Sequence, residues 1–193
     1  MRKIICYLLT ISLVLTSCSV YKKSTATDDG RITINLIQIN DVYEIAPLNS
    51  GREGGIARVS ALKKNYVQKN PNTLLVLAGD FLSPSVYNSL KHQGESIKGK
   101  QMVASLNAAG LDLAIFGNHE FDIREKELQQ RINESGFQWI ASNTFHKKGD
   151  KVLPFEKTTG GSATASFPKV LIRSFSDADG TTARIGFIAI TLP

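Results

Sequence analysis

Acidic, amide and imidazole side chains stand at the ends of three apolar segments of the sequence. Asp41 ends the first segment, Asp80 ends the second, and Asn118 with His119 ends the third. Carboxylate, amide oxygen and imidazole are donors that suit Mn, Zn or Fe. Carboxylates crowded together would repel one another unless a cation lay between them. These residue types therefore predict a metal site, provided that folding brings the three ends together.

The segments that carry these residues are predicted to be parallel strands separated by helices. Apolar stretches typical of strands occupy about residues 32–39, 73–80, 111–118 and 137–143. Helical periodicity occupies residues 56–69, 99–110 and 124–136. The ligand crevice of an open α/β sheet lies beyond the carboxyl ends of its strands, so we expect the polar ends to share one crevice.

The sequence changes character after residue 144. Residues 145–165 contain turns and short strands, and residues 169–190 predict two strands joined by a turn at 177–180. Repeated strand–helix units followed by β-rich sequence favour an α/β domain with at least one mostly parallel sheet. The chain stops at Pro193 directly after an apolar strand, and we expect it to be the front part of a longer protein whose sheet has further partners.

Composition and charge indicate one globular domain. The 193 residues are 42% hydrophobic and 21% charged, which is enough for a sizeable core. The formal net charge is +6, and leaving out Arg2 and Lys3 reduces it to 21 basic against 17 acidic residues, or +4. This mild excess does not predict a nucleic-acid partner, and the sequence gives no indication of the oligomeric state. His92 and His146 stand among polar loop residues and are expected to be solvated.

Residues 1–17 have the features of a lipoprotein signal peptide. A basic start, MRK, precedes an apolar stretch too short to be a lasting transmembrane helix. The following LTSC, which ends at Cys18, resembles the bacterial lipobox, where the leader is cut before a cysteine that receives a diacylglyceryl group; an ordinary secretory leader is the alternative. We therefore expect an exported protein, anchored to the membrane of the bacterial cell envelope by lipid on Cys18, with residues 18–31 as a polar tether.

Three motifs, in this order, resemble those of the calcineurin-like metallophosphoesterases. They are IQIND at 37–41, GD at 79–80 and GNHEFD at 117–122. The stretches GGIAR and RIGFIAIT are also similar to one branch of that family, the bacterial 5′-nucleotidases and 2′,3′-cyclic phosphodiesterases. The resemblance extends over about residues 32–192. It implies a two-sheet β core flanked by helices, present here only in part, with residues 32–193 as the amino-terminal portion of a catalytic domain.

The resemblance also implies a role for each motif residue. Asp41 would bind one divalent metal ion, Asp80 would bridge two, and Asn118 would bind the second through its amide oxygen. His119 would face the phosphate, with its ring oriented by Asp122. The two ions, of Mn, Zn or Fe, would activate water for the hydrolysis of phosphate esters, with nucleotides as the expected substrates.

Tyr43 departs from the family pattern, in which Asp-x-His supplies a histidine to the first metal. A phenol, with an ordinary pKa of about 10, is a poor ligand for a divalent ion. Three interpretations stay open: Tyr43 is an unusual ligand, a hydrogen-bond neighbour of the ligands, or a sign that the first site is weakened. Glu120 is also open, between an acceptor behind the ligands and a surface residue.

Two functions are compatible with these residues. The first is a lipid-anchored metallophosphoesterase that hydrolyses nucleotides. The alternative is a catalytically weakened or inactive lipid-anchored binding protein that retains the fold. The family completes its metal shells with a later histidine and a Gly-His-x-His motif, which this sequence does not contain. We therefore expect little or no activity from these 193 residues alone.

Overall fold

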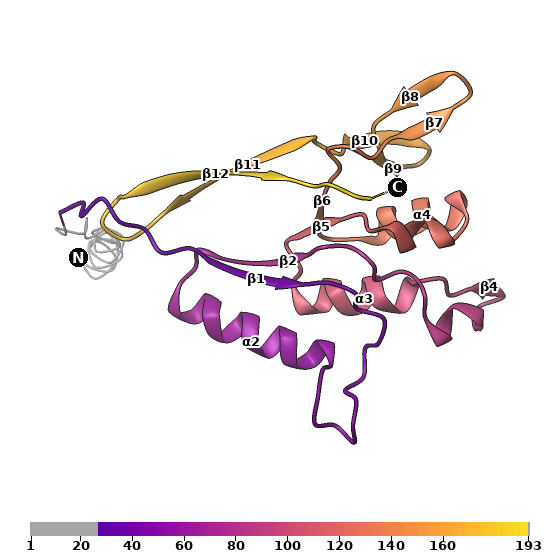
Figure 1. The fold of residues 1–193 in the computed structure, drawn as a ribbon, viewed down its shortest axis with the longest axis horizontal. Coiled ribbons are helices and arrows are strands. Elements are labelled where there is room, and N and C mark those ends of the chain that lie inside the picture. The colour runs from indigo at the N-terminus through magenta and orange to yellow at the C-terminus, as the bar shows by residue number, and fades with distance from the viewer. Residues whose placement is uncertain (1–26, 193) are drawn as a thin grey trace, which may run out of the picture.

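A four-stranded parallel sheet forms the centre of the protein. The computed structural model describes residues 27–192, so the predicted signal peptide and Cys18 lie outside the described residues. The strand order is β1-β2-β5-β6, and every neighbouring pair is parallel (Figure 1). The strands are β1 (Asn35–Ile39), β2 (Thr73–Leu77), β5 (Leu113–Ile115) and β6 (Gln138–Ile140). The predicted parallel α/β sheet is therefore confirmed.

Three helices connect these strands, and α2 and α3 lie together beneath the sheet in Figure 1. They are α2 (Ile56–Lys69), α3 (Lys100–Ala109) and α4 (Glu125–Glu134). A core of buried apolar side chains joins the helices to the sheet; it includes Leu75, Leu77, Met102, Leu106, Phe116, Leu128, Ile132 and Trp139. Both faces of β2 are covered, which explains why its sequence is apolar throughout.

The apolar face of α2 is less buried than its periodicity predicts. Ile56 is buried at the start of the helix, whereas Leu62, Tyr66 and Val67 are 47%, 43% and 38% exposed. The reason is position: β1 is the edge strand of the sheet, and the packing partners of α2 are α3 and β2.

A long hairpin covers the other face of the sheet. Strands β11 (Val170–Ser176) and β12 (Thr182–Ile188) pair antiparallel, with the predicted turn between them. Their inward side chains alternate with exposed ones and pack onto the sheet. This second core contains Leu74, Leu113, Ile140, Phe175 and Ala189, with Leu171, Ile185 and Phe187 around it. The hairpin thus forms a second β layer opposite α2 and α3 (Figure 1).

Short hairpins and two 3₁₀ segments complete the described chain. The hairpins are β3–β4 (Lys91–His92, Glu95–Ser96), β7–β8 (His146–Lys148, Lys151–Leu153) and β9–β10 (Glu156–Thr159, Ser162–Ser166). The 3₁₀ segments are η1 (Val86–Ser89) and η2 (Asn118–Asp122). Within residues 27–192, no helix has the length and apolar character needed to cross a membrane.

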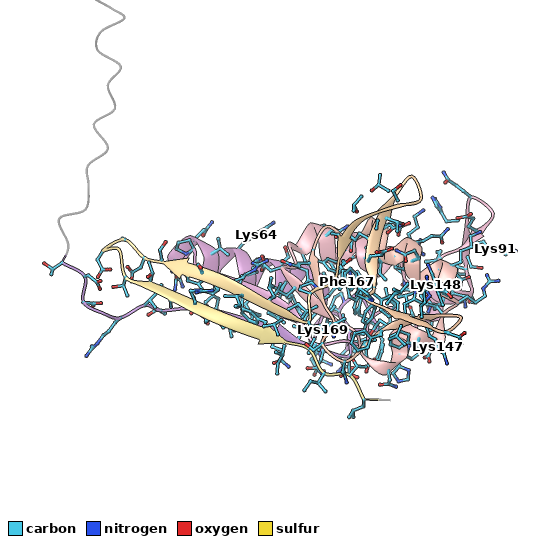
Figure 2. The ribbon with its side chains drawn as sticks, turned by 90° about the horizontal axis from the view of Figure 1, so that it is seen from above. Lys64, Lys91, Lys147, Lys148, Phe167 and Lys169 are labelled. Carbon is cyan, nitrogen blue, oxygen red and sulfur yellow. The ribbon has the colours of Figure 1, made fainter. Side chains whose placement is uncertain are left out.

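One expectation about a surface residue differs from the structure. His146 is not solvated as predicted: its ring stacks on Phe155 at 5.5 Å, and Nε2 lies 2.8 Å from a carboxylate oxygen of Glu125. The stacking surface that Phe155 offers could not be seen in the local sequence. Figure 2 shows exposed lysines on several elements: Lys64 lies on α2 and Lys91 on β3, while Lys147 and Lys148 lie together on β7.

Candidate functional site

The carboxyl ends of β1, β2 and β5 meet through hydrogen bonds. The backbone N–H of Asp41 donates to the carbonyl of Gly79 at 3.2 Å. The backbone N–H of His119 donates to Oδ1 of Asp80 at 2.9 Å. Each predicted polar end therefore contacts the next at the carboxyl edge of the sheet. Asp41 and Asn118 line separate cavities there, so the single shared crevice stays a prediction.

Two of the carboxylates stand on unusual backbone. Asp41 has φ 53° and Asp80 has φ 60°, both in the left-handed region that few residues other than glycine adopt. A backbone of this kind costs about 1–3 kcal/mol per residue and clusters at functional sites. The same conformation in both residues turns each aspartate sharply out of its strand. Asn49, Ser50, Gln93 and Lys98 also have positive φ, so what distinguishes the two aspartates is this backbone together with their place at the strand ends.

Close approach of the two loops depends on glycine. A Cβ atom on Gly117 would lie 2.1 Å from Oδ1 of Asp80. A Cβ atom on Gly79 would lie 2.5 Å from the backbone nitrogen of Gly117. No side chain fits at either distance, so glycine before Asp80 and glycine before Asn118 are what allow the loops to touch.

Glu120 forms hydrogen bonds with both of these loops. It is fully buried, and its carboxylate accepts hydrogen bonds from the backbone N–H groups of Asp80, Phe81, Leu82 and Gly117. Burial raises the pKa of the Glu120 carboxyl, and the four N–H groups act against that rise. Of the two alternatives that the sequence leaves open, the structure shows the acceptor behind the motif residues and not a surface residue.

His119 and Asp122 form a side-chain pair on the 3₁₀ turn η2. Residues three apart eclipse one another on such a turn, and Nδ1 of His119 lies 2.8 Å from Oδ2 of Asp122. The bond to Asp122 raises the pKa of the His119 ring above its ordinary value. Because Nδ1 is used by this contact, Nε2 is the ring atom that can meet a ligand.

Tyr43 bridges the first and third strand ends. Its hydroxyl donates to Oδ1 of Asp41 at 3.0 Å, and its ring meets that of His119 edge-on, with centroids 6.2 Å apart. Partial burial and the bond to Asp41 raise the pKa of Tyr43 to about 12, and bonds from Asn40 and Tyr43 lower the pKa of Asp41. This hydroxyl bond agrees with the interpretation of Tyr43 as a hydrogen-bond neighbour of Asp41. The unusual-ligand and weakened-site interpretations stay predictions.

The donors at the strand ends fit part of a metal site. Among the described residues, neither Asp41 nor Asp80 forms an ion pair with Lys or Arg, so a bound cation would balance their charge. Asn118 lines a neighbouring cavity of about 420 Å³ together with Asn143 and Thr191. Residues 27–192 contain no group of three or more His, Cys, Asp or Glu side chains arranged to share one ion. The oxygen donors suit a divalent metal but form an incomplete set.

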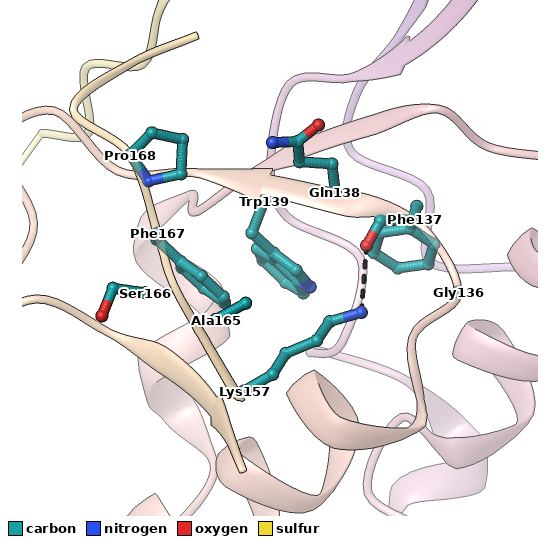
Figure 3. A pocket seen from close by; sticks show the side chains of 9 residues that line it. All are labelled: Gly136, Phe137, Gln138, Trp139, Lys157, Ala165, Ser166, Phe167 and Pro168. Carbon is teal, nitrogen blue, oxygen red and sulfur yellow. Dashed lines mark hydrogen bonds between the residues drawn. The ribbon is translucent and has the colours of Figure 1, made fainter. Parts of the chain in front are cut away.

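A second cavity, of about 280 Å³, lies apart from this site. It surrounds the beginning of β6, whereas the polar residues follow the carboxyl ends of the strands (Figure 3). Trp139 and Phe167 stack there at 5.7 Å, and the Lys157 ammonium donates to the carbonyl of Phe137 at 3.2 Å. None of the predicted site residues lines this cavity.

Comparison with known proteins identifies the family. The family description "Calcineurin-like phosphoesterase" matches residues 34–177, which is most of the chain. The chain belongs to the calcineurin-like phosphoesterase family. Proteins of this family act on phosphate esters and generally use divalent metal ions. The family of this phosphoesterase chain is thus one of hydrolases.

Its relatives include nucleotide-cleaving enzymes. The trifunctional nucleotide phosphoesterase protein YfkN of Bacillus subtilis is 24% identical over 74% of this chain and 10% of the relative. Snake venom 5′-nucleotidase of Gloydius brevicauda is 28% identical over 48% of this chain and 16% of the relative. The solved 5′-nucleotidase precursor of Thermus thermophilus shares the fold, with a TM-score of 0.61 and 21% identity over 84% of this chain and 29% of its own. The phosphoesterase chain thus spans a minor part of each.

Proposed function

We propose that the strand-end site hydrolyses phosphate esters of nucleotides. The observation that carries the proposal is the position of Asp41 and Asp80 directly after neighbouring parallel strands, in loops joined by the bond from the Asp41 N–H to the Gly79 carbonyl. Both carboxylates stand on left-handed backbone beside the glycine contact, and neither has a basic partner among the described residues. Such an arrangement costs stability and suits a bound cation. The names of the relatives, nucleotide phosphoesterase and 5′-nucleotidase, support nucleotides as the substrates.

In this proposal two divalent ions are held by three residues. Asp41 would hold one ion, Asp80 would contact both, and Asn118 would hold the second. When bound, the ions would lower the pKa of water towards about 7 and offset charge on the phosphoryl group. Mn, Zn or Fe would suit these donors.

The His119–Asp122 pair would manage the proton of the leaving group. Asp122 accepts from Nδ1 and fixes the ring, which leaves Nε2 to donate to the leaving oxygen or to a phosphoryl oxygen. The 3₁₀ turn supports this role because it holds His119 beside Asp80 through the backbone bond at 2.9 Å. Tyr43 would orient Asp41 through its hydroxyl.

We also propose that the protein works outside the cytoplasm. Cys18, as the lipidated residue, would anchor the chain to the cell envelope, with residues 18–31 as the tether. Incorporation of labelled palmitate into the protein in bacterial cells, compared with a Cys18→Ala variant, tests this. Label that persists in the variant would contradict it.

The activity is tested on the longest natural chain that contains these residues. Bound metals are measured, and 5′-nucleotides and 2′,3′-cyclic nucleotides are assayed with Mn and with Zn. We expect turnover that Asp80→Ala abolishes and that Asp150→Ala, in the exposed β7–β8 turn, leaves unchanged. A protein that holds no metal and is inert in every combination would contradict the enzyme.

The alternative function is a binding protein that retains the fold with a weakened site. Tyr43 in the place of the family's histidine favours it, because its hydroxyl engages Asp41 and its raised pKa keeps it a neutral donor. Tyr43→His separates the two. If the first site is weakened, the substitution raises Mn affinity and turnover; if Tyr43 is part of a working site, both fall.

A further inference from the structure

Glu120 stands out among the groups that the proposed reaction does not use. It is one of the largest fully buried side chains in the described part of the molecule and the only carboxylate among them. We propose that Glu120 is a positioning residue, which fixes the Asp80 loop against the turn that carries Asn118 and His119. The strength of metal binding would then depend on it. This inference rests on the proposed function for its metal, but its geometry does not.

The two carboxylate oxygens of Glu120 accept hydrogen bonds from different backbone groups. Oε1 accepts from Phe81 at 2.8 Å and Leu82 at 3.1 Å, which shapes the loop after β2. Oε2 accepts from Asp80 at 2.8 Å and from Gly117 at 2.6 Å. A single oxygen atom is therefore bonded to the loops that follow both β2 and β5, and it sets the spacing between them.

This spacing decides where the Asp80 carboxylate points. The backbone of Asp80 is held by Glu120, and Oδ1 of Asp80 is held by the N–H of His119. Asp80, whose backbone is left-handed, is thus held both at its backbone nitrogen and at its side-chain carboxylate. A shift of the Gly117 turn would move both the Asp80 contact and Asn118, the next residue along the chain.

No other group can take the place of this carboxylate. Two ionised oxygens offer about four acceptor positions, and four N–H groups fill them. Glutamine has the same shape but would turn an NH₂ group towards two N–H donors. Because Glu120 is fully buried, water cannot satisfy those donors without opening the loops.

Glu127 provides a matched control. It is also buried, at 6% exposure, and its carboxylate accepts from the backbone and side chain of Arg124. Both partners lie at the start of α4, so Glu127 joins no two loops. A general effect of placing glutamine at a buried glutamate would appear in both variants, and an effect on the proposed metal site would appear only at Glu120.

The experiment compares Glu120→Gln, Glu127→Gln and the parent in the longest natural chain. Mn²⁺ affinity is measured by calorimetry below the unfolding temperature, together with Tm and the kcat and KM for a 5′-nucleotide. We expect Glu120→Gln to lose a few degrees of Tm and Glu127→Gln about one degree. Glu120→Gln alone should weaken Mn²⁺ binding about tenfold or more and lower kcat, with KM changed less than about twofold. Equal Mn²⁺ affinity in the parent and Glu120→Gln would overturn the proposal.

Hydrogen exchange in the parent protein gives a second test that needs no variant. The amides of residues 80–82 and of Gly117 should be protected relative to the exposed turn at residues 149–150. Exchange as fast as in that turn would overturn the positioning role even if Glu120→Gln does not fold. A parent that shows this protection but neither binds Mn²⁺ nor hydrolyses a nucleotide would instead overturn the proposed function, and with it the link from Glu120 to metal.

Discussion

Glu120 and Lys157 are two of the charged side chains that bind backbone groups in the described part of the molecule, and they lie at opposite ends of the sheet. Glu120 lies under the carboxyl ends of β2 and β5 and accepts from four N–H groups. Lys157, on β9, lies near the beginning of β6 and donates to the carbonyls of Ser135 and Phe137 (Figure 3). The anionic Glu120 thus accepts from backbone donors, and the cationic Lys157 donates to backbone acceptors.

The two groups differ in how much of the fold depends on them. Ser135 is the C-cap of α4, so Lys157 performs the common task of a cation at a helix end. Its environment lowers the pKa of the Lys157 ammonium through burial alone, and its stem lines a cavity. Glu120 is fully enclosed and connects two loops. We infer that the conformation of the strand-end loops depends on the Glu120 charge, whereas the end of α4 depends less on the Lys157 charge.

The largest expected effect is that of Glu120→Ala. It removes the acceptor of four buried N–H groups and leaves a void, so we expect a loss of about 3–5 kcal/mol in the free energy of unfolding. Urea unfolding followed by circular dichroism measures it. A loss no greater than that of a Lys157 variant would mean that the two charges are equivalent, and the comparison would fail.

Gly117→Ala tests the loop contact without changing a charge. The added Cβ would lie 2.1 Å from Oδ1 of Asp80, so we expect a loss of about 2–3 kcal/mol. Gly186→Ala on β12 is the control, since its Cβ would meet nothing within 4 Å and neither glycine has a positive φ. That variant should stay within about 0.5 kcal/mol of the parent. Similar losses at both glycines would show that the strand-end loops are not tightly apposed.

The fold was readable from the sequence because local patterns determine most of it. The apolar run at residues 73–77 and the helical periodicity at 56–69 each identify an element with its correct type. The turn at 177–180 likewise predicts the β11–β12 hairpin. Burial was predicted less well, since Leu62 on α2 belongs to an apolar stripe and is still 47% exposed. Periodicity identifies the face of a helix but not the neighbour that is needed to cover it.

For the site, the sequence indicated which residues could share a crevice but not what holds them there. Asp41 and Asp80 stand out because polar residues directly follow apolar strands. The role of Glu120 depends on N–H groups 38 to 40 residues away in the chain, and only the folded backbone brings them within reach. The contact of Tyr43 with His119 is non-local in the same way.

Lys157→Met measures the weaker of the two charged groups. Methionine keeps most of the apolar stem beside Trp139 and removes the donors to Ser135 and Phe137. We expect a loss of about 1 kcal/mol, the usual net contribution of a hydrogen bond, because the cavity that Lys157 and Phe137 line gives water access to the carbonyl groups. Urea unfolding beside Glu120→Ala gives the direct ratio of the two effects. A loss above about 3 kcal/mol would place Lys157 in the same class as Glu120.

The smallest expected effect is that of Glu127→Gln on the free energy of unfolding, and it depends on pH. The bond from Arg124 lowers the pKa of the Glu127 carboxyl below its ordinary value. A lowered folded-state pKa means that its stabilisation is present above the unfolded-state pKa and is lost as the pH falls through the folded-state pKa. Because the Arg124 side chain is 83% exposed, water screens the pair, so we expect Glu127→Gln to cost about 0.5 kcal/mol at pH 6. Urea unfolding at pH 6 and pH 3 should show the parent and the variant converging at the lower pH; a difference that grows towards acid would contradict the assignment of Glu127 as an ion-paired helix cap.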